Sequence, residues 1–148
     1  MYKKILVAID DSETSRCALL EALHIARTSK AKLYITHVAD ETLLSMHNRT
    51  ISNTMNFDNA IIAIAAAGRQ LLDEAMKSAT GVDAQPLLLE ALNRRVSETL
   101  ADKAKELDVD LIVIGRHGRR GLATFILGSV AEQIAKIASA SVLLVRKH

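Results

Sequence analysis

A continuous apolar run near the start of the chain constrains the fold more than any other feature. The residues from Ile5 to Ile9 are all apolar, and two carboxylates, Asp10 and Asp11, follow them. A strand without alternation between apolar and polar residues is buried on both faces, which is typical of the centre of a parallel sheet. The sequence therefore predicts a central strand over residues 4–10, with helices covering both faces of its sheet.

The rest of the chain alternates between strand and helix patterns. Further strands are predicted over residues 32–39, 85–90, 109–114 and 141–146, and helices over residues 12–29, 57–79, 94–107 and 130–138. Asp11 or Ser12 is expected to cap the first helix, and Asn93 to cap the third. Residues 40–56 show no periodicity and are expected to form a long surface loop.

This order of elements predicts an α/β fold in one domain over residues 1–148, an open, twisted, parallel five-stranded sheet with helices on both faces. Pro86, near the start of the third strand, favours an edge position for that strand. In such sheets the ligand binds at the carboxyl ends of the strands, where the direction of winding reverses. If the first and fourth strands flank that point, Asp10 and the segment that begins at Gly115 meet in one crevice.

The composition disfavours several classes of protein. No apolar run approaches the roughly 18 residues of a membrane span, and the first residues lead directly into a strand, so we expect a cytoplasmic protein without membrane insertion. The single cysteine, Cys17, allows neither an internal disulfide nor a cysteine-based metal cage. A net charge of +2 and an aromatic content of 3% disfavour nucleic acid as a partner.

A glycine-rich segment after the fourth strand points to a phosphate ligand. Gly115 and Gly118 are followed, after nine residues, by Gly128 and Ser129, and four of the six glycines lie between residues 115 and 128. Glycine permits positive φ and the close approach of another group, and Ser129 adds a hydroxyl to the unpaired amides of a helix start. The alternative is that the glycines only turn the chain and the serine only caps a helix. Their concentration directly after a strand favours phosphate, although the spacing matches neither Walker A nor the dinucleotide fingerprint.

Few side chains near this segment suggest chemistry beyond binding. Asp10 could bind a ribose hydroxyl or Mg²⁺, or it could serve to cap the first helix. His117 could donate to a phosphate or point to solvent. One of three arginines is expected to clamp the terminal phosphate, the candidates being Arg116, Arg119 and Arg120. The segment contains no lysine, and no second acidic residue is placed to orient a water, so any ATP hydrolysis is expected to be slow.

The chain resembles the universal stress proteins, in particular their ATP-binding branch. The resemblance covers almost the whole length. It rests on residues 3–10 with Ser12, on His37-Val38 at the end of the second strand, and on the motif Gly115-x2-Gly118-x9-Gly128-Ser129. It implies the sheet order 3-2-1-4-5, a homodimer, and ATP or another adenine nucleotide with Mg²⁺ at the point where the winding reverses.

Matched position by position, the resemblance implies a site made mostly of backbone groups. Asp10 would lie by the ribose and the phosphate-bound metal, and the Val38 backbone would bind the adenine edge. Further implied contacts come from Ala8, Ile114 and Gly115 at the nucleoside and from His117, Gly118, Gly128, Ser129 and Val130 at the phosphates. Ala8 stands where relatives often have proline or valine, and Asn93 stands where many have glycine.

A phosphate motif without catalytic groups predicts a nucleotide-dependent stress-response regulator. Nucleotide occupancy would change the surface around residues 40–56 and the binding of a partner that the sequence does not identify. One alternative is an ATP-consuming adenylating enzyme on a related sheet, although such enzymes usually have a glycine–serine loop after the first strand, where this chain has residues 10–13 without glycine. Another is a dimeric interaction module that binds no nucleotide and pairs through its fifth strand, residues 141–145.

Overall fold

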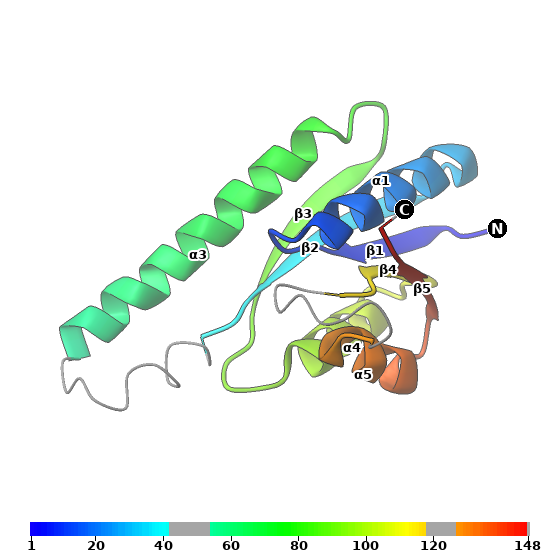
Figure 1. Cartoon of the computed structure of the whole chain (residues 1–148). Coiled ribbons are helices and arrows are strands. Elements are labelled where there is room, and N and C mark those ends of the chain that lie inside the picture. The colour runs from blue at the N-terminus through cyan, green and yellow to red at the C-terminus, as the bar shows by residue number, and fades with distance from the viewer. Residues whose placement is uncertain (42–53, 118–126, 148) are drawn as a thin grey trace.

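The computed structural model describes residues 1–41, 54–117 and 127–147, and five parallel strands form its central sheet (Figure 1). The strands are ordered β3-β2-β1-β4-β5, which confirms the predicted order. They are β1 (Lys4–Ala8), β2 (Lys32–Ala39), β3 (Ala84–Glu90), β4 (Leu111–Gly115) and β5 (Ser141–Val145). The helices are α1 (Glu13–Ser29), α3 (Thr54–Lys77), α4 (Val96–Glu106) and α5 (Ser129–Ile137).

Strand β1 occupies the centre of the sheet, as its apolar run predicts. It pairs in parallel with β2 on one side and with β4 on the other. In this register Ala8 lies between Thr36 of β2 and Ile114 of β4. Because paired residues of neighbouring strands face the same side of a sheet, these three residues form a row across its carboxyl end.

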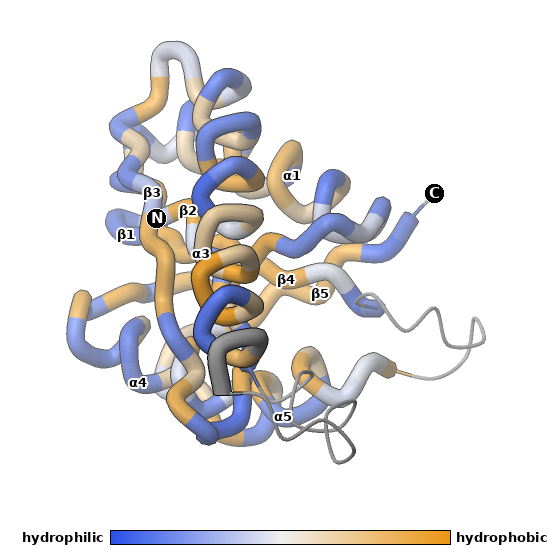
Figure 2. Tube along the Cα trace, turned by 90° about the vertical axis from the view of Figure 1, so that its left-hand side faces the viewer, coloured by the Kyte–Doolittle hydropathy of each residue, from blue (hydrophilic) through white to orange (hydrophobic). Residues whose placement is uncertain are grey.

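Helices cover both faces of the sheet, also as predicted. Helices α1 and α3 pack on the face that carries Ile5 and Val7. Helices α4 and α5 pack on the opposite face, against Leu6 and Ile112. The central strands are mostly hydrophobic in Figure 2, whereas the helices alternate between hydrophobic and hydrophilic residues. Two apolar layers therefore enclose the sheet.

The structure corrects the predicted ends of several elements, among them β1, α3 and β4, which begins at Leu111 and not at Val109. β1 ends at Ala8 and not at Asp10, because the Asp10 N–H donates to a side chain, the Ser15 hydroxyl, after the last contact with β2. Helix α3 begins at Thr54, so residues 54–56 are helical and not part of the expected loop. The rest of that loop, residues 42–53, lies outside the described residues. Although α3 has 24 residues, neither it nor any other described helix is long and apolar enough to cross a membrane.

The helix caps confirm one prediction and overturn another. Ser12 caps α1, since its hydroxyl accepts the Ser15 N–H at 3.2 Å. Asn93 does not cap α4, which follows Arg95, a residue without a side-chain capping bond. With φ of +64°, Asn93 has left-handed backbone, whereas a capping residue needs extended backbone. The expected edge position of β3, which contains Pro86, is confirmed.

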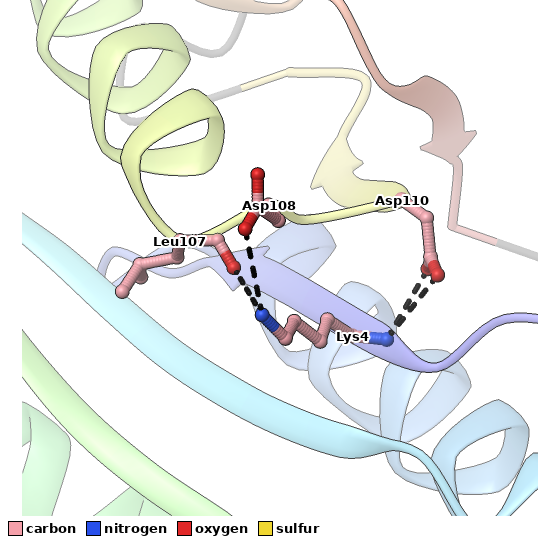
Figure 3. A network of polar contacts seen from close by, with 4 residues as sticks. All are labelled: Lys4, Leu107, Asp108 and Asp110. Carbon is pink, nitrogen blue, oxygen red and sulfur yellow. Dashed lines mark hydrogen bonds and ion pairs between the residues drawn. The ribbon is translucent and has the colours of Figure 1, made fainter.

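Asp110 joins the amino ends of β1 and β4 (Figure 3). Its carboxylate accepts the Lys3 N–H at 2.9 Å and the Lys4 N–H at 3.3 Å. The Lys4 Nζ donates to the Leu107 carbonyl at 2.9 Å and lies 3.9 Å from the Asp108 carboxylate. These contacts hold together the amino ends of β1 and β4, on the side of the sheet opposite the cleft-forming carboxyl ends.

Candidate functional site

A cleft of about 820 Å³ lies along the carboxyl ends of the strands. Its volume falls within the range of about 300–1,000 Å³ that is typical of small-molecule sites. The predicted site residues that line it are Ala8, Asp10, Val38, Ile114, Gly115, His117, Gly128, Ser129 and Val130. Residues from both halves of the chain thus meet in one place, as the sequence predicts.

The winding of the chain explains the position of this cleft. β1 leads into α1, which packs on one face of the sheet, whereas the neighbouring β4 precedes α5 on the other face. Because the two connections leave the sheet in opposite directions, they open a crevice between them. Asp10 lies on one side of that crevice and Gly115 on the other.

Asp10 stands where the chain leaves β1 for α1. Its Oδ1 accepts the Ser12 N–H at 2.8 Å, and its own N–H donates to the Ser15 hydroxyl at 2.8 Å. Among the described residues, its Oδ2 has no hydrogen-bond partner. The carboxylate is half-buried and lines the cleft. Asp10 therefore supports the turn before α1 with one oxygen, and the cap itself belongs to Ser12.

Gly115 brings the end of β4 against the start of α1. A Cβ atom at Gly115 would lie 3.1 Å from both the carbonyl carbon and the carbonyl oxygen of Thr14. The Thr14 hydroxyl also donates to the His117 carbonyl. Neither described glycine of the motif, Gly115 or Gly128, uses the positive φ that glycine permits. What Gly115 permits is a close approach, and the approaching group is the protein's own backbone.

Helix α5 begins without a side-chain cap. Its N-cap residue is Gly128, with φ of −60° and ψ of 148°, and no side chain of the described residues accepts the first amides there. The Gly128 N–H donates to the Arg116 carbonyl at 2.9 Å, which places the start of α5 beside the end of β4. Gly128, Ser129 and Val130 all line the cleft. The amides of a helix start carry partial positive charge, so this end of the cleft suits an anion.

Glu132 is the acidic residue in the first turn of α5. The Lys136 Nζ donates to its Oε1 at 2.8 Å. This hydrogen bond and the charge of Lys136 lower the pKa of the Glu132 carboxyl. The negative charge in the first turn of α5 is thus paired with a lysine one turn farther along.

The cleft has an apolar lobe on the face of α4 and α5. The row of Thr36, Ala8 and Ile114 lies on the sheet side of this lobe, and Val38 continues it along β2. Four helix residues line the opposite side: Val96 and Leu100 of α4, and Val130 and Ala131 of α5. Walls of this kind suit a planar, mostly apolar group such as a nucleobase.

The described residues offer little for a metal ion on their own. They contain no group of three or more His, Cys, Asp or Glu residues that could hold a cation. Asp10 fits the role of a single carboxylate ligand, so a bound Mg²⁺ would take its remaining oxygens from phosphate groups and water, as it commonly does. Gly118 and two of the three candidate arginines, Arg119 and Arg120, lie outside the described residues, whereas the third, Arg116, lines the cleft.

Sequence reasoning missed two threonines: Thr36, which lines the cleft, and Thr14, which contacts Gly115 and His117. Thr36 is the polar residue in an otherwise apolar face of β2, between Tyr34 and Val38, and that interruption is a signal that could have identified it. Thr14 gives no such signal, because a threonine in the first turn of a helix is ordinary. Its role appears only when α1 and β4 are placed in space.

The comparisons with known proteins agree with this geometry. A model of the family described as "Universal stress protein family" matches residues 1–146. The chain belongs to the universal stress protein family. Universal stress protein YxiE of Bacillus subtilis is 33% identical over 151 aligned positions, which cover 99% of this chain and 100% of that protein.

Solved structures of universal stress proteins share the fold. A protein of this family from Burkholderia pseudomallei matches with a TM-score of 0.76 and 32% identity, covering 97% of this chain and 95% of the other. A universal stress protein in complex with cAMP matches with a TM-score of 0.69 and 26% identity, covering 97% of each chain. The resemblance to universal stress proteins that the sequence shows is therefore confirmed.

Proposed function

We propose that this universal stress protein binds ATP, or another adenine nucleotide, with Mg²⁺ in the cleft at the carboxyl ends of β1 and β4, and acts as a nucleotide-dependent regulator in the cytoplasm. One observation carries the proposal. A single cleft is lined by every described residue that the glycine motif and the family resemblance assign to the site. The family member solved in complex with cAMP supports an adenine nucleotide as the class of ligand.

The base would occupy the apolar lobe. Its faces would pack between the sheet residues Ala8 and Ile114 and the helix residue Val130, all of which line the cleft. The backbone of Val38, at the end of β2, would pair with the edge of the ring. A pocket with apolar walls and a few fixed polar groups is the usual arrangement for such a ligand.

The phosphates would lie at the start of α5. The amides of Ser129 and Val130 and the Ser129 hydroxyl would donate to phosphate oxygens, because no side chain that the structure describes caps this helix start. Asp10, across the cleft, would bind a ribose hydroxyl or the Mg²⁺ ion. The bound Mg²⁺ would neutralise phosphate charge, and the residues of this chain would orient the nucleotide.

We propose a regulator and not a metabolic enzyme. Phosphoryl transfer needs groups that orient the attacking water and stabilise the leaving charge. In the part of the chain that the structure describes, the half-buried carboxylates that line the cleft are Asp10 and Asp40, and Asp10 already supports the turn before α1. Any ATP hydrolysis would therefore be slow.

We also propose that β5 forms a homodimer interface. β5 lies at an edge of the sheet, and Val142, Leu143, Leu144 and Val145 are only half-buried there. An edge strand with apolar side chains offers unpaired backbone groups to a second chain. Equilibrium sedimentation separates a monomer from a dimer, and a monomer at micromolar concentration would contradict this part of the proposal.

Isothermal titration calorimetry with Mg-ATP tests nucleotide binding. Wild-type protein should bind Mg-ATP, and Ser129→Ala should bind about tenfold more weakly because it loses a hydrogen bond to a charged group. Ser139→Ala is the matched control, since Ser139 is exposed beyond the other end of α5, and it should bind like the wild type. Separate calorimetric titrations with cAMP, ADP and AMP rank the adenine nucleotides by their dissociation constants.

Two results would contradict the proposal. One is the absence of binding to every adenine nucleotide up to about 1 mM, which corresponds to less than about 4 kcal/mol of binding free energy. The other is equal binding of Mg-ATP by the wild type and by Ser129→Ala, which would show that the phosphates do not bind at the start of α5.

A further inference from the structure

We propose that the Thr36 hydroxyl contacts the nucleobase and is the side chain that makes the apolar lobe specific for a nitrogen heterocycle. This inference rests on the proposed function and extends it to a residue that neither the glycine motif nor the family resemblance indicates. Three observations carry it: the position of Thr36 in the sheet, its burial, and the absence of a hydrogen-bond partner for its hydroxyl among the described residues.

The position follows from the register of the strands. Thr36 pairs with Ala8, and Ala8 pairs with Ile114. Neighbouring strands lie about 4.8 Å apart, so Thr36 and Ile114 flank the short side chain of Ala8 at roughly that distance on either side. Alternation along β2 places Thr36 on the same face as Tyr34 and Val38, which pack with α4 and α5. Thr36 therefore borders the space above Ala8 that the base would occupy.

The burial of Thr36 makes its hydroxyl unusual. The residue has no exposed surface, and its Oγ1 has no hydrogen-bond partner in the described part of the chain. A buried hydroxyl without a partner destabilises a protein, whereas valine has nearly the same shape without that cost. A threonine at this position is explained if the hydroxyl gains its partner when a ligand enters. Small side-chain movements, which are common when ligands bind, bring a ring edge within reach.

The chemistry of the lobe selects the class of ligand group. A hydroxyl both donates and accepts, so it can pair with a ring nitrogen or with an exocyclic amino group of a base. A phosphate would not enter here, because Ala8, Val38, Ile114 and Leu100 line the lobe with apolar groups. The anion-binding amides lie instead at the start of α5. Thr36 and Ser129 thus act on opposite ends of the same nucleotide.

Two substitutions of Thr36 separate the hydroxyl from the packing. Thr36→Val keeps the shape and removes the hydroxyl, whereas Thr36→Ser keeps the hydroxyl and removes a methyl group. The dissociation constant for Mg-ATP is measured by calorimetry for the full chain and both variants, and the melting temperature is measured without nucleotide. We expect Thr36→Val to weaken Mg-ATP binding about tenfold and Thr36→Ser to stay within about threefold of wild type.

The melting temperature of the ligand-free protein distinguishes a binding role from a structural one. We expect Thr36→Val to melt no lower than the wild type, because it removes a buried hydroxyl without a partner. Thr36→Ser should melt lower, because it leaves a small cavity. Thr36→Val should thus bind Mg-ATP more weakly, whereas Thr36→Ser should be the less stable variant. If Thr36 had only a structural role, the less stable variant would also be the weaker binder.

Each other outcome overturns the inference. If Thr36→Val binds Mg-ATP like the wild type, the hydroxyl does not contact the ligand, and the proposed function stands without it. If Thr36→Val loses binding and stability together, Thr36 is a packing residue. If the wild type binds no adenine nucleotide, this inference fails together with the proposed function.

Discussion

Gly115 at the end of β4 lies so close to Thr14 in the first turn of α1 that a Cβ atom would come within 3.1 Å of the Thr14 carbonyl. Contacts this short are rare between a Cβ and backbone atoms, so either the helix start or the strand end must move to admit a methyl group. The Thr14 hydroxyl donates to the His117 carbonyl two residues farther on. The first turn of α1 therefore positions the chain that leaves β4 into the glycine motif.

Gly115→Ala should weaken both folding and nucleotide binding. The added methyl group pushes on backbone, which cannot rotate away, so we expect a loss of about 1–2 kcal/mol in the free energy of unfolding. We also expect Mg-ATP to bind at least several-fold more weakly, because the residues that follow Gly115 line the cleft. Urea denaturation and calorimetric titration measure the two effects.

Gly81→Ala is the control for that substitution. Gly81 has φ of +76° and no atom within 4 Å of a built Cβ, so alanine there costs about 1 kcal/mol through backbone strain alone. It should lower stability to a similar degree and leave Mg-ATP binding unchanged. If Gly115→Ala also left binding unchanged, the contact with Thr14 would have no part in shaping the site.

Gly68→Ala should destabilise the protein although alanine favours helix. A Cβ at Gly68 would lie 2.9 Å from Cδ2 of His37 and 2.8 Å from Cδ1 of Leu88. Leu88 can rotate, but His37 is fixed by the 2.8 Å hydrogen bond from its Nδ1 to the Ile9 carbonyl. We expect overpacking of about 2 kcal/mol to exceed the helix gain of about 1 kcal/mol, for a net loss of about 1 kcal/mol.

Ala66→Gly on the exposed side of α3 measures the helix contribution separately, by the same urea denaturation. It should lose about 1 kcal/mol from helix propensity alone. A Gly68→Ala protein more stable than the wild type would show that α3 can shift away from β2 at no cost.

Asp110→Ala should cost more stability than Asp108→Asn. Asp110 accepts backbone N–H groups of Lys3 and Lys4, at 2.9 and 3.3 Å, and its removal leaves the start of β1 without these bonds. We expect a loss of about 1–2 kcal/mol. Asp108 is 89% exposed and lies 3.9 Å from the Lys4 Nζ, so Asp108→Asn should change the free energy of unfolding by less than about 0.5 kcal/mol. Equal losses in thermal denaturation would contradict this assignment.

Lys30→Gly should stabilise the protein. Lys30 ends α1 with φ of 54° and ψ of 36°, a left-handed conformation that costs a residue with a side chain about 1 kcal/mol and glycine almost nothing. We expect an increase of about 0.5–1 kcal/mol in the free energy of unfolding. Lys30→Ala, which removes the same charge but keeps the strain, should give no increase, and a gain from alanine equal to that from glycine would point to charge instead.

The sheet could be predicted from sequence because its signals are local. The apolar run from Ile5 to Ile9 fixes a central strand, and Pro86 marks an edge strand, so the layers follow from patterns within single segments. The order of the strands came from the family resemblance, since periodicity does not specify which strands pair. Helix ends were less predictable, as Asn93 shows. Asparagine favours both helix caps and left-handed turns, and only the path of the chain after β3 selects the turn.

The site was predictable where its residues belong to one motif or to a strand end. Asp10 follows β1, Gly115 ends β4 and Ser129 begins α5, and the topology brings all three to one cleft. Thr14 acts through neighbours on another element, so its sequence context carries little information about it, whereas Thr36 interrupts an apolar face of β2 and so gives a signal. The position of Gly115 could be predicted but its role could not: the sequence suggests room for a ligand, and the structure shows that the backbone of α1 uses that room.

Backbone amide chemical shifts of ¹⁵N-labelled full-length protein, recorded during titration with Mg-ATP, test most directly whether nucleotide binds at the carboxyl ends of β1 and β4. We expect large shifts for the amides of Asp10, Gly115, Ser129 and Val130, and none for Lys32 or Asp110 at the amino ends of the strands. Saturating Mg-ATP that leaves the first group unchanged, or shifts only the amides at the amino ends, would contradict binding at this site.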